Sequence, residues 1–396
     1  MTLSTMKPTG IKDRVVDVFL SVMKNKWFIV TCSFFTLSCV LTYLEMFKNS
    51  EERLTNGNKY AIPEKEPPVI LYYEQHVANW FPVFNLSRTC PDYCIFTNDL
   101  RLYRKSKVVI FFRTLRKSPP VKLKDQIWLY LTFESPLRTR TPDIRWKDSI
   151  KQFDGIMSYR PNSEVLVPFG RIRKLPNAYN NNVNYSSIYA RKNMEVAWLV
   201  SHCGTQSKRE QYVKEMKKYI NVDVFGPCGD KRCPTTSDRG IKQVDALTNC
   251  KTDISKRYKF YLAFENTLCE HYSSEKVFGI YDRNNFMIPV VRGDPKVSRY
   301  LPKGTYISTF DYASPKALAE YLHYVGSSEE RYTRYIKEKL KYNVTLWTEH
   351  FVDSICDLCT KLKSNSINLN PSKKFNLLSR LKEDKCFDPL DVKQMH

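Results

Sequence analysis

Short runs of β-branched and aromatic residues recur along this chain and limit the folds that it can adopt. Each run is four to seven residues long, and a loop or a segment of helix length separates it from the next. Runs of this kind are typical of strands that are buried on both faces of a parallel sheet. The sequence therefore predicts an α/β fold. The first group comprises residues 69–73, 108–112 and 127–133, and the second comprises 196–200, 222–225, 258–264 and 287–291.

The two groups of runs predict two α/β halves joined by a polar segment. In the second half, residues 207–220 have apolar side chains at the spacing of an amphipathic helix. Ser207 and Glu210 have the spacing of a capping box at the start of that helix. The stretch PNAYNNNVNYSS, residues 176–187, is rich in Asn and indicates the boundary between the halves.

The N-terminal region contains an uncharged apolar segment. Residues 27–44 read WFIVTCSFFTLSCVLTYL, and as a helix they would span about 27 Å, close to the thickness of a bilayer core. Basic residues precede the segment, among them Lys24 and Lys26, so the positive-inside rule places residues 1–26 in the cytosol. A cleaved signal peptide is the alternative, although no small-x-small cleavage site follows. We expect a membrane anchor followed by a polar stem at residues 45–68.

Glycosylation acceptors and cysteines agree with a lumenal location for the rest of the chain. The acceptor triplets begin at Asn85, Asn184 and Asn343, all beyond the predicted anchor. Ten of the twelve cysteines also follow the anchor, and an oxidising compartment favours disulfides. A zinc site is the alternative, but no His stands at ligand spacing. The most closely spaced candidates are Cys90 with Cys94, Cys356 with Cys359, and Cys228 with Cys233.

The formal net charge of +22 predicts attraction to phosphates, acidic glycans or nucleic acid. Charge alone does not choose among these ligands. The predicted anchor, the glycosylation acceptors and the lack of a basic-aromatic repeat argue against nucleic acid, and we expect none as a partner.

One apolar run ends directly in polar residues. The stretch YKFYLAFENTLCEHYSSEK, residues 258–276, continues from a predicted buried strand into Glu265 and Asn266. Ligands bind at the carboxyl edge of open α/β sheets, so these side chains are candidates for a site. Tyr272 and Lys276 follow within the same stretch.

Three charged residues could bind a sugar nucleotide at this edge. Lys276, near the start of a predicted helix, would suit a phosphate. Glu275 could hydrogen-bond a sugar hydroxyl or stabilise positive charge at a sugar carbon. Arg209, in the first turn of the helix after strand 196–200, is a second candidate for a diphosphate. All three could equally be solvated charges at helix ends.

A carboxylate also ends a strand in the first half. The run IWLYLTFE ends in Glu134, and Pro136 cannot continue a central strand. A carboxylate at a strand end can remove a proton from an attacking hydroxyl, or it can be an ordinary surface acid. The chain contains no Asp-x-Asp pair, so we expect Lys, Arg and helix dipoles, rather than a bound metal, to meet a diphosphate.

The stretch at residues 258–276 closely resembles the donor-binding signature of the alpha-1,3-fucosyltransferases, glycosyltransferase family ten. That signature reads Phe-x-Leu-x-Phe-Glu-Asn-Ser, a short spacer, and Asp-Tyr-x-Thr-Glu-Lys. The resemblance covers roughly residues 68–360. Further blocks resemble the family in the same order, namely TFESP, MSYRPNSEVLVPFG, AWLVSHC, IPVVRG, SPKALAEYL and CDLC.

The resemblance implies the GT-B fold, with two Rossmann-like domains and the active site between them. We expect an acceptor domain at residues 69–185, a donor domain at residues 186–345 and a C-terminal tail at residues 346–396. The implied reaction is inverting transfer of fucose from GDP-β-L-fucose to a GlcNAc hydroxyl of glycoprotein or glycolipid glycans, in alpha-1,3 linkage. The implied location is the Golgi membrane, as a single-pass type II protein. No cofactor is required, and a divalent cation would at most stimulate turnover.

The resemblance also implies roles for individual residues. Glu134 matches the proposed base, Lys276 and Arg209 match the phosphate ligands, and Glu275 matches the acid near the fucose. Other positions of the donor pocket are matched by Tyr261, Asn266, Tyr272, Ser201 and Tyr159.

Several positions depart from the family pattern around these residues. His271 stands where the family usually has Asp, and His202 where it has Asn. Ser273 and Ser274 replace a hydrophobic residue and Thr. After Lys276 the family usually continues Leu-Trp-Arg-Asn-Ala, whereas this chain reads VFGIY at residues 277–281.

Two alternatives remain open beside an antennal fucosyltransferase. One is a member of the same family that fucosylates a protein or the core of an N-glycan. The other is an inactive glycan-binding Golgi protein of the same fold, which the departures around Glu275 and Lys276 motivate. We further predict that Cys90 and Cys94 pair with Cys356 and Cys359, which would attach the tail to the first domain.

Overall fold

The computed structural model describes residues 66–73, 90, 94–112, 121–139, 147–176, 183–232, 242–366 and 375–393. The predicted cytosolic tail, the predicted anchor, almost all of the stem and Asn85 lie outside these residues. Within the described ranges, no helix combines the length and the hydropathy that a membrane span requires. Residues 67–396 form one compact unit.

The first sheet contains every strand predicted for the first half. Its described strands lie in the order β2-β1-β3-β4-β5-β6, and all of them pair in parallel. Val108 and Leu129 are completely buried, as expected of strands covered on both faces. The strands are β1 (Val69–Tyr72), β2 (Ile95–Thr97), β3 (Ser106–Phe112), β4 (Ile127–Thr132), β5 (Gly155–Ser158) and β6 (Val165–Leu166), with η3 (Leu100–Lys105) and α3 (Lys147–Ile150) between them.

The second sheet is also parallel and has β10 at its centre. The described order is β12-β11-β10-β8-β9, with β8 and β11 beside β10. The strands are β8 (Met194–Leu199), β9 (Val222–Phe225), β10 (Tyr258–Phe264), β11 (Ile288–Arg292) and β12 (Ile307–Ser308). The helical segments are α4 (Tyr185–Arg191), α5 (Arg209–Met216), α6 (Lys242–Arg257), α7 (Glu275–Phe278), η5 (Gly279–Tyr281), η6 (Val297–Arg299), η7 (Thr309–Asp311), α8 (Pro315–Gly326) and α9 (Glu329–Lys339).

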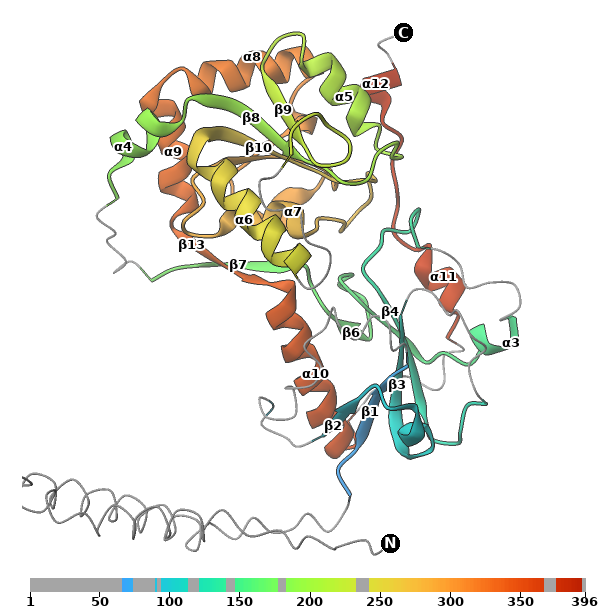
Figure 1. Cartoon of the computed structure of the whole chain (residues 1–396). Helices are drawn as coiled ribbons and strands as arrows, with labels where there is room; N and C mark the ends of the chain where they lie inside the picture. The colour runs from blue at the N-terminus through green and yellow to red at the C-terminus, as the bar shows by residue number, and fades with distance from the viewer. Residues whose placement is uncertain are drawn as a thin grey trace, which may run out of the picture. The chain divides into compact units, whose positions relative to one another are not determined.

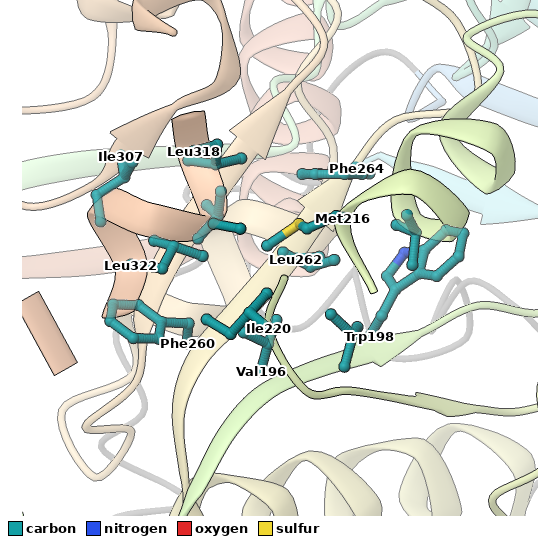
Figure 2. Packing of buried hydrophobic residues seen from close by; sticks show 14 of the residues in the cluster. Val196, Trp198, Met216, Ile220, Phe260, Leu262, Phe264, Ile307, Leu318 and Leu322 are labelled. Atoms are coloured by element: carbon teal, nitrogen blue, oxygen red, sulfur yellow. The ribbon is translucent and has the colours of Figure 1, made fainter. Parts of the chain in front are cut away.

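The side chains of β10 alternate between two hydrophobic clusters. Tyr261 and Ala263 belong to one cluster, together with residues of α7 and η5. Phe260, Leu262 and Phe264 belong to the other, where α5 and α8 cover the sheet (Figure 1). Figure 2 shows this second cluster, in which these side chains pack with Trp198, Met216, Ile220, Leu318 and Leu322. Burying a side chain of this size contributes about 1.5–3 kcal/mol, so β10 is a rigid platform for the residues that follow it.

The predicted capping box at Ser207 is wrong. Helix α5 begins at Arg209, and its N-cap residue is Lys208, which has a left-handed backbone (φ 47°) and makes no side-chain cap bond. The Ser207 hydroxyl instead donates to the backbone carbonyl of Glu265 at 2.7 Å. Glu210 accepts from the Thr205 hydroxyl at 3.4 Å. The contact with the end of β10 replaces the local cap.

Two disulfides join the N-terminal edge of the first sheet to helix α10 (Trp347–Lys363). Cys90 pairs with Cys356 and Cys94 with Cys359, which confirms the predicted link between the two close pairs and adds which cysteine joins which. Helix α10 follows β13 (Tyr342–Leu346), which pairs antiparallel with β7 (Gly170–Lys174). Phe351, Ile355 and Leu358 of α10 lie in a hydrophobic cluster of the first sheet.

The end of the chain does not stay on the first half, where the whole tail was expected. Helix α11 (Leu377–Leu381) packs into a cluster of the first sheet. The segment then crosses to the second half, where Cys386 forms a disulfide with Cys269, and Val392 of α12 (Leu390–Lys393) joins the cluster over β10. Asp391 also forms an ion pair with Arg292, the last residue of β11. We call residues 375–393 the C-terminal strap.

Candidate active site

A buried carboxylate directly follows β10. The Glu265 side chain is only 2% exposed. One of its oxygens accepts from the backbone N–H and from the hydroxyl of Ser274, each at 2.8 Å. Ser274 is also the N-cap residue of α7. Glu265 therefore holds the start of α7 against the end of the central strand. The sequence indicated Glu265 as a polar residue at the carboxyl edge of the sheet but assigned it no role; its contacts with Ser274 and Lys276 appear only in the structure.

Lys276 lies between two carboxylates. Its Nζ is 3.1 Å from Oε2 of Glu265 and 3.2 Å from Oε1 of Glu275. Burial lowers the pKa of Lys276, but the two carboxylates outweigh it and raise the pKa above its usual value. Burial raises the pKa of Glu275, but the ammonium groups of Lys276 and Lys251 outweigh it, and the net pKa is lowered. Both groups are charged at neutral pH.

Arg209 is a buried cation that hydrogen-bonds backbone carbonyls beside the site. Its side chain is 3% exposed, with Nη1 donating to the carbonyl of Phe264 at 2.7 Å and Nη2 to the carbonyl of His202 at 2.6 Å. Phe264 is the last residue of β10 and His202 stands shortly after β8, so the guanidinium joins the two strand ends. Its charge also acts on Lys276, whose pKa it lowers. Arg209 thus supplies a fixed positive charge and is largely enclosed by the backbone.

The tyrosines predicted for the donor pocket are buried. Tyr261 lies within β10 and is 1% exposed; burial raises its pKa, and the positive charge of Lys276 opposes that effect. The rings of Tyr159 and Tyr272 lie 5.4 Å apart between centroids, and Phe169 packs against both. Tyr159 follows β5 of the first sheet, whereas Tyr272 belongs to the loop after β10. The aromatic cluster thus includes residues of both halves.

Glu134 acts on the same cluster. It stands two residues after β4, and its backbone carbonyl accepts from the Thr139 hydroxyl at 3.1 Å. Burial raises the pKa of Tyr272 well above its usual value, and the negative charges of Glu265 and Glu134 raise it further. Burial likewise raises the pKa of Tyr159, with a smaller contribution from Glu134. Carboxylates at the ends of β4 and β10 therefore act on one tyrosine.

The remaining predicted residues lie at the surface or beside the strand ends. Ser201 is exposed and follows β8, and the carbonyl of Asn266 accepts from the Ser207 N–H at 3.1 Å. Asn184 is exposed, and its side chain caps α4 by accepting from the Ser187 N–H at 2.9 Å. Asn343 is exposed on β13. Neither glycosylation acceptor is enclosed by the fold.

The C-terminal strap contacts His271, the residue that stands where the resembled family usually has Asp. His271 has a left-handed backbone (φ 61°), and its N–H donates to Asp294 at 2.9 Å. Its Nδ1 lies 3.4 Å from Oδ1 of Asp384, a strap residue whose other oxygen lies 3.0 Å from Nε of Arg160. Sequence reasoning missed Asp384, because its partners lie more than a hundred residues away. The loop before Glu275 is thus connected through the strap to the first half.

A small polar cavity lies behind the strand ends. Its volume is about 10 Å³, enough for one water molecule, and Glu265, Ser273 and Asp294 contribute to its lining. Among the residues with described positions, no group of three or more His, Cys, Asp or Glu side chains could hold a metal ion. The charged groups of this site are instead carboxylates, lysines and Arg209.

Family models match most of the described chain. Residues 189–378 match the C-terminal model of glycosyltransferase family 10 (fucosyltransferase), and residues 65–170 match the N-terminal fucosyltransferase model. The first match contains β8, β10, α7 and the cluster around Lys276. The second contains the first sheet and Glu134.

Curated relatives carry fucosyltransferase names. Alpha-(1,3)-fucosyltransferase C of Drosophila melanogaster is 30% identical over 64% of this chain and 59% of its own length. Glycoprotein 3-alpha-L-fucosyltransferase A of Drosophila melanogaster is 33% identical over 61% of this chain and 44% of its own length. The chain thus spans about half the length of these two relatives. The human 4-galactosyl-N-acetylglucosaminide 3-alpha-L-fucosyltransferase FUT6 is 28% identical over 83% of this chain and 89% of its own length.

Proposed function

The chain belongs to glycosyltransferase family 10, the fucosyltransferases, and on that premise we propose that it is an alpha-1,3-fucosyltransferase. The donor in this proposal is GDP-β-L-fucose, and the acceptor is a GlcNAc hydroxyl of a glycoprotein or glycolipid glycan. The names of the curated relatives support the linkage, and the human relative's name supports a galactosyl-GlcNAc acceptor. A GT-B arrangement, with the active site between two Rossmann-like domains, is part of the proposal.

One structural observation gives the main support for the proposed function. The ring centroid of Tyr272, in the loop after β10 of the second half, lies 5.4 Å from that of Tyr159, which follows β5 of the first half. A displacement reaction needs a base on one side of the reacting carbon and charge stabilisation for the leaving group on the other. Glu134 and the cluster around Lys276 provide groups of these two kinds close to the same aromatic side chains.

The proposed reaction is one direct displacement. The Glu134 carboxylate takes the proton of the acceptor hydroxyl as its oxygen attacks the anomeric carbon of fucose. The new carbon–oxygen bond forms while the bond between that carbon and the β-phosphate oxygen breaks. GDP leaves with the bonding electrons, and inversion converts the β-linked donor into an α-fucoside. Lys276 and Arg209 stabilise the negative charge that develops on the diphosphate.

Glu275 has a separate role in this scheme. Its side chain is 48% exposed and carries a negative charge beside Lys276. A carboxylate in this position would stabilise positive charge at the sugar carbon and accept a hydrogen bond from a fucose hydroxyl. The lowered pKa of Glu275 keeps it ionised for that role at neutral pH.

The cellular location is a proposal from the sequence. The uncharged segment at residues 27–44 would anchor the chain in the Golgi membrane, with the catalytic part in the lumen. The described disulfides, such as the one between Cys94 and Cys359, agree with an oxidising compartment. Exposed acceptor triplets at Asn184 and Asn343 would then be available for glycosylation.

An acceptor panel tests the proposal and separates its alternatives. Full-length protein in microsomes would be supplied with GDP-fucose and with N-acetyllactosamine, core N-glycan or peptide acceptors, and GDP release would be measured. Turnover with N-acetyllactosamine supports the antennal enzyme, and turnover only with core N-glycans or peptides replaces it with the corresponding subgroup. GDP binding without turnover on any acceptor would replace the enzyme with a glycan-binding protein.

A further inference from the structure

A lysine from another helix reaches the cluster around Lys276. Lys251 lies on α6, the helix that precedes β10. A Cβ atom on Gly279 would lie 3.4 Å from Nζ of Lys251. Gly279 is the C-cap residue of α7, directly after the turn that carries Glu275 and Lys276. The Lys251 ammonium group thus lies against the helical turn that presents the charges of the site.

Lys251 gives this cluster of charged groups a net positive charge. Lys276 is shared by two carboxylates, at 3.1 Å from Glu265 and 3.2 Å from Glu275. With Arg209 and Lys251, the five groups carry three positive and two negative charges, a net charge of +1. Without Lys251 the net charge is zero, because two cations then face two carboxylates. A diphosphate anion binds a cluster of net positive charge more tightly than a neutral one.

The lack of a side chain at residue 279 leaves room for Lys251 beside α7. Gly279 has no side chain, and the ammonium of Lys251 lies in van der Waals range of the place where one would begin. A positive charge is therefore present beside α7, but it comes from α6.

We propose that Lys251 is a positioning residue of the donor site, because it places a positive charge beside the turn of α7 that carries Glu275 and Lys276. It balances Glu275, so that Lys276 can interact with the diphosphate of the sugar nucleotide. This inference rests on the proposed function, because it assumes that the cluster binds a nucleoside diphosphate. Burial lowers the pKa of Lys251, the Glu275 carboxylate opposes that effect and the Lys276 ammonium adds to it, which agrees with the three charges acting on one another.

A charge exchange between α6 and α7 tests the inference. In the full chain, Lys251→Met should weaken GDP binding, measured by calorimetry, and raise the KM for GDP-fucose, each about tenfold. A tenfold change corresponds to about 1.4 kcal/mol. The kcat should change by less than about threefold, since Glu134 is untouched. Lys251→Arg should stay within about threefold of wild type in both constants.

The double variant separates charge from packing. Gly279→Arg alone should weaken GDP binding, because the added side chain meets Lys251. Lys251→Met combined with Gly279→Arg should recover most of the lost affinity, since the charge returns from the other helix. Lys256→Met is the matched control, because Lys256 lies on the same helix with a side chain that is 66% exposed. It should bind GDP as wild type does.

Two results would overturn the inference. One is an unchanged Kd for GDP in a folded Lys251→Met variant, as judged by its Tm. The other is a double variant that binds GDP no better than Lys251→Met. If Lys251→Met does not fold, the comparison of Lys251→Arg with wild type decides, and a loss greater than about threefold contradicts the role. Wild-type protein that binds GDP but turns over no donor contradicts the proposed function alone.

Discussion

The ammonium nitrogen of Lys276 lies 3.1 Å from Oε2 of Glu265, a carboxylate that is almost fully buried. The same carboxylate holds Ser274, so the end of β10 and the start of α7 form one unit. In this unit Glu265 is the buried scaffold, Lys276 is half-buried and Glu275 is the exposed acid. The distinction between a buried and an exposed acid in one motif leads to the first prediction.

Glu265→Gln should lower both stability and donor affinity. The substitution keeps the shape but removes the charge that holds Lys276 and accepts from Ser274, and disrupting a buried polar network of this kind costs about 1–3 kcal/mol. Thermal unfolding should show the lower Tm, and the KM for GDP-fucose should rise severalfold. Glu270→Gln is the control, because Glu270 belongs to the same loop but pairs with the exposed Lys296. Equal effects of the two substitutions would refute the scaffold role of Glu265.

The disulfide between Cys269 and Cys386 should affect donor binding as well as stability. It closes a separation of 117 residues, and removing a disulfide of that kind costs about 2–5 kcal/mol. Cys269 also borders the loop that carries His271 and Tyr272. We expect the double change of both cysteines to Ser to lower the Tm and to raise the KM for GDP-fucose.

The disulfide between Cys203 and Cys228 provides the comparison. Its separation is 25 residues, and it connects the segments that follow β8 and β9. Its removal should lower the Tm by a smaller amount, with less effect on the KM. A KM that responds equally to both removals would show that the strap has no specific effect on the donor loop.

The sequence predicted the framework of the fold because the framework is local. Each apolar run predicted as a strand is one, since burial on both faces requires a continuous apolar segment. The two close cysteine pairs, which lie at opposite ends of the catalytic region in the sequence, likewise predicted that they would be joined. The placement of Lys276 beside a strand end followed from the position of the polar residues after β10.

Other features depend on partners that are distant in the sequence. The predicted capping box at Ser207 failed because α5 has Lys208 as its N-cap residue, while the Ser207 hydroxyl donates to the Glu265 carbonyl, 58 residues later. The return of the strap to the second half depends on Asp391 meeting Arg292, which no local pattern indicates. Lys251 was missed for the same reason, since only the fold brings α6 beside Gly279.

A buried lysine should make stability increase with pH. Lys192 is 4% exposed, its Nζ donates to the Ser255 carbonyl, and burial lowers its pKa to about 7. Between about pH 7 and 10.4 the unfolded chain therefore holds a proton that the folded chain releases, so the free energy of unfolding rises with pH across this window. The contribution is at most about 1.4 kcal/mol per pH unit.

Lys192→Met should remove this dependence. The Tm of wild type minus that of the variant should increase from pH 7 to pH 9.5, as measured by calorimetry at fixed ionic strength. Lys256→Met, at an exposed position, should show a constant difference over the same range. A constant difference for Lys192→Met as well would mean that the buried amine keeps an ordinary pKa.

The most direct test of the proposed function is GDP release from GDP-fucose by full-length protein, with the best acceptor of the panel, for wild type and Glu134→Gln. The substitution keeps the size of the side chain but removes the base, and the account predicts a kcat lower by about 10²–10⁴-fold with little change in Tm or in the KM for GDP-fucose. A Glu134→Gln variant that turns over within a few-fold of wild type would contradict the account.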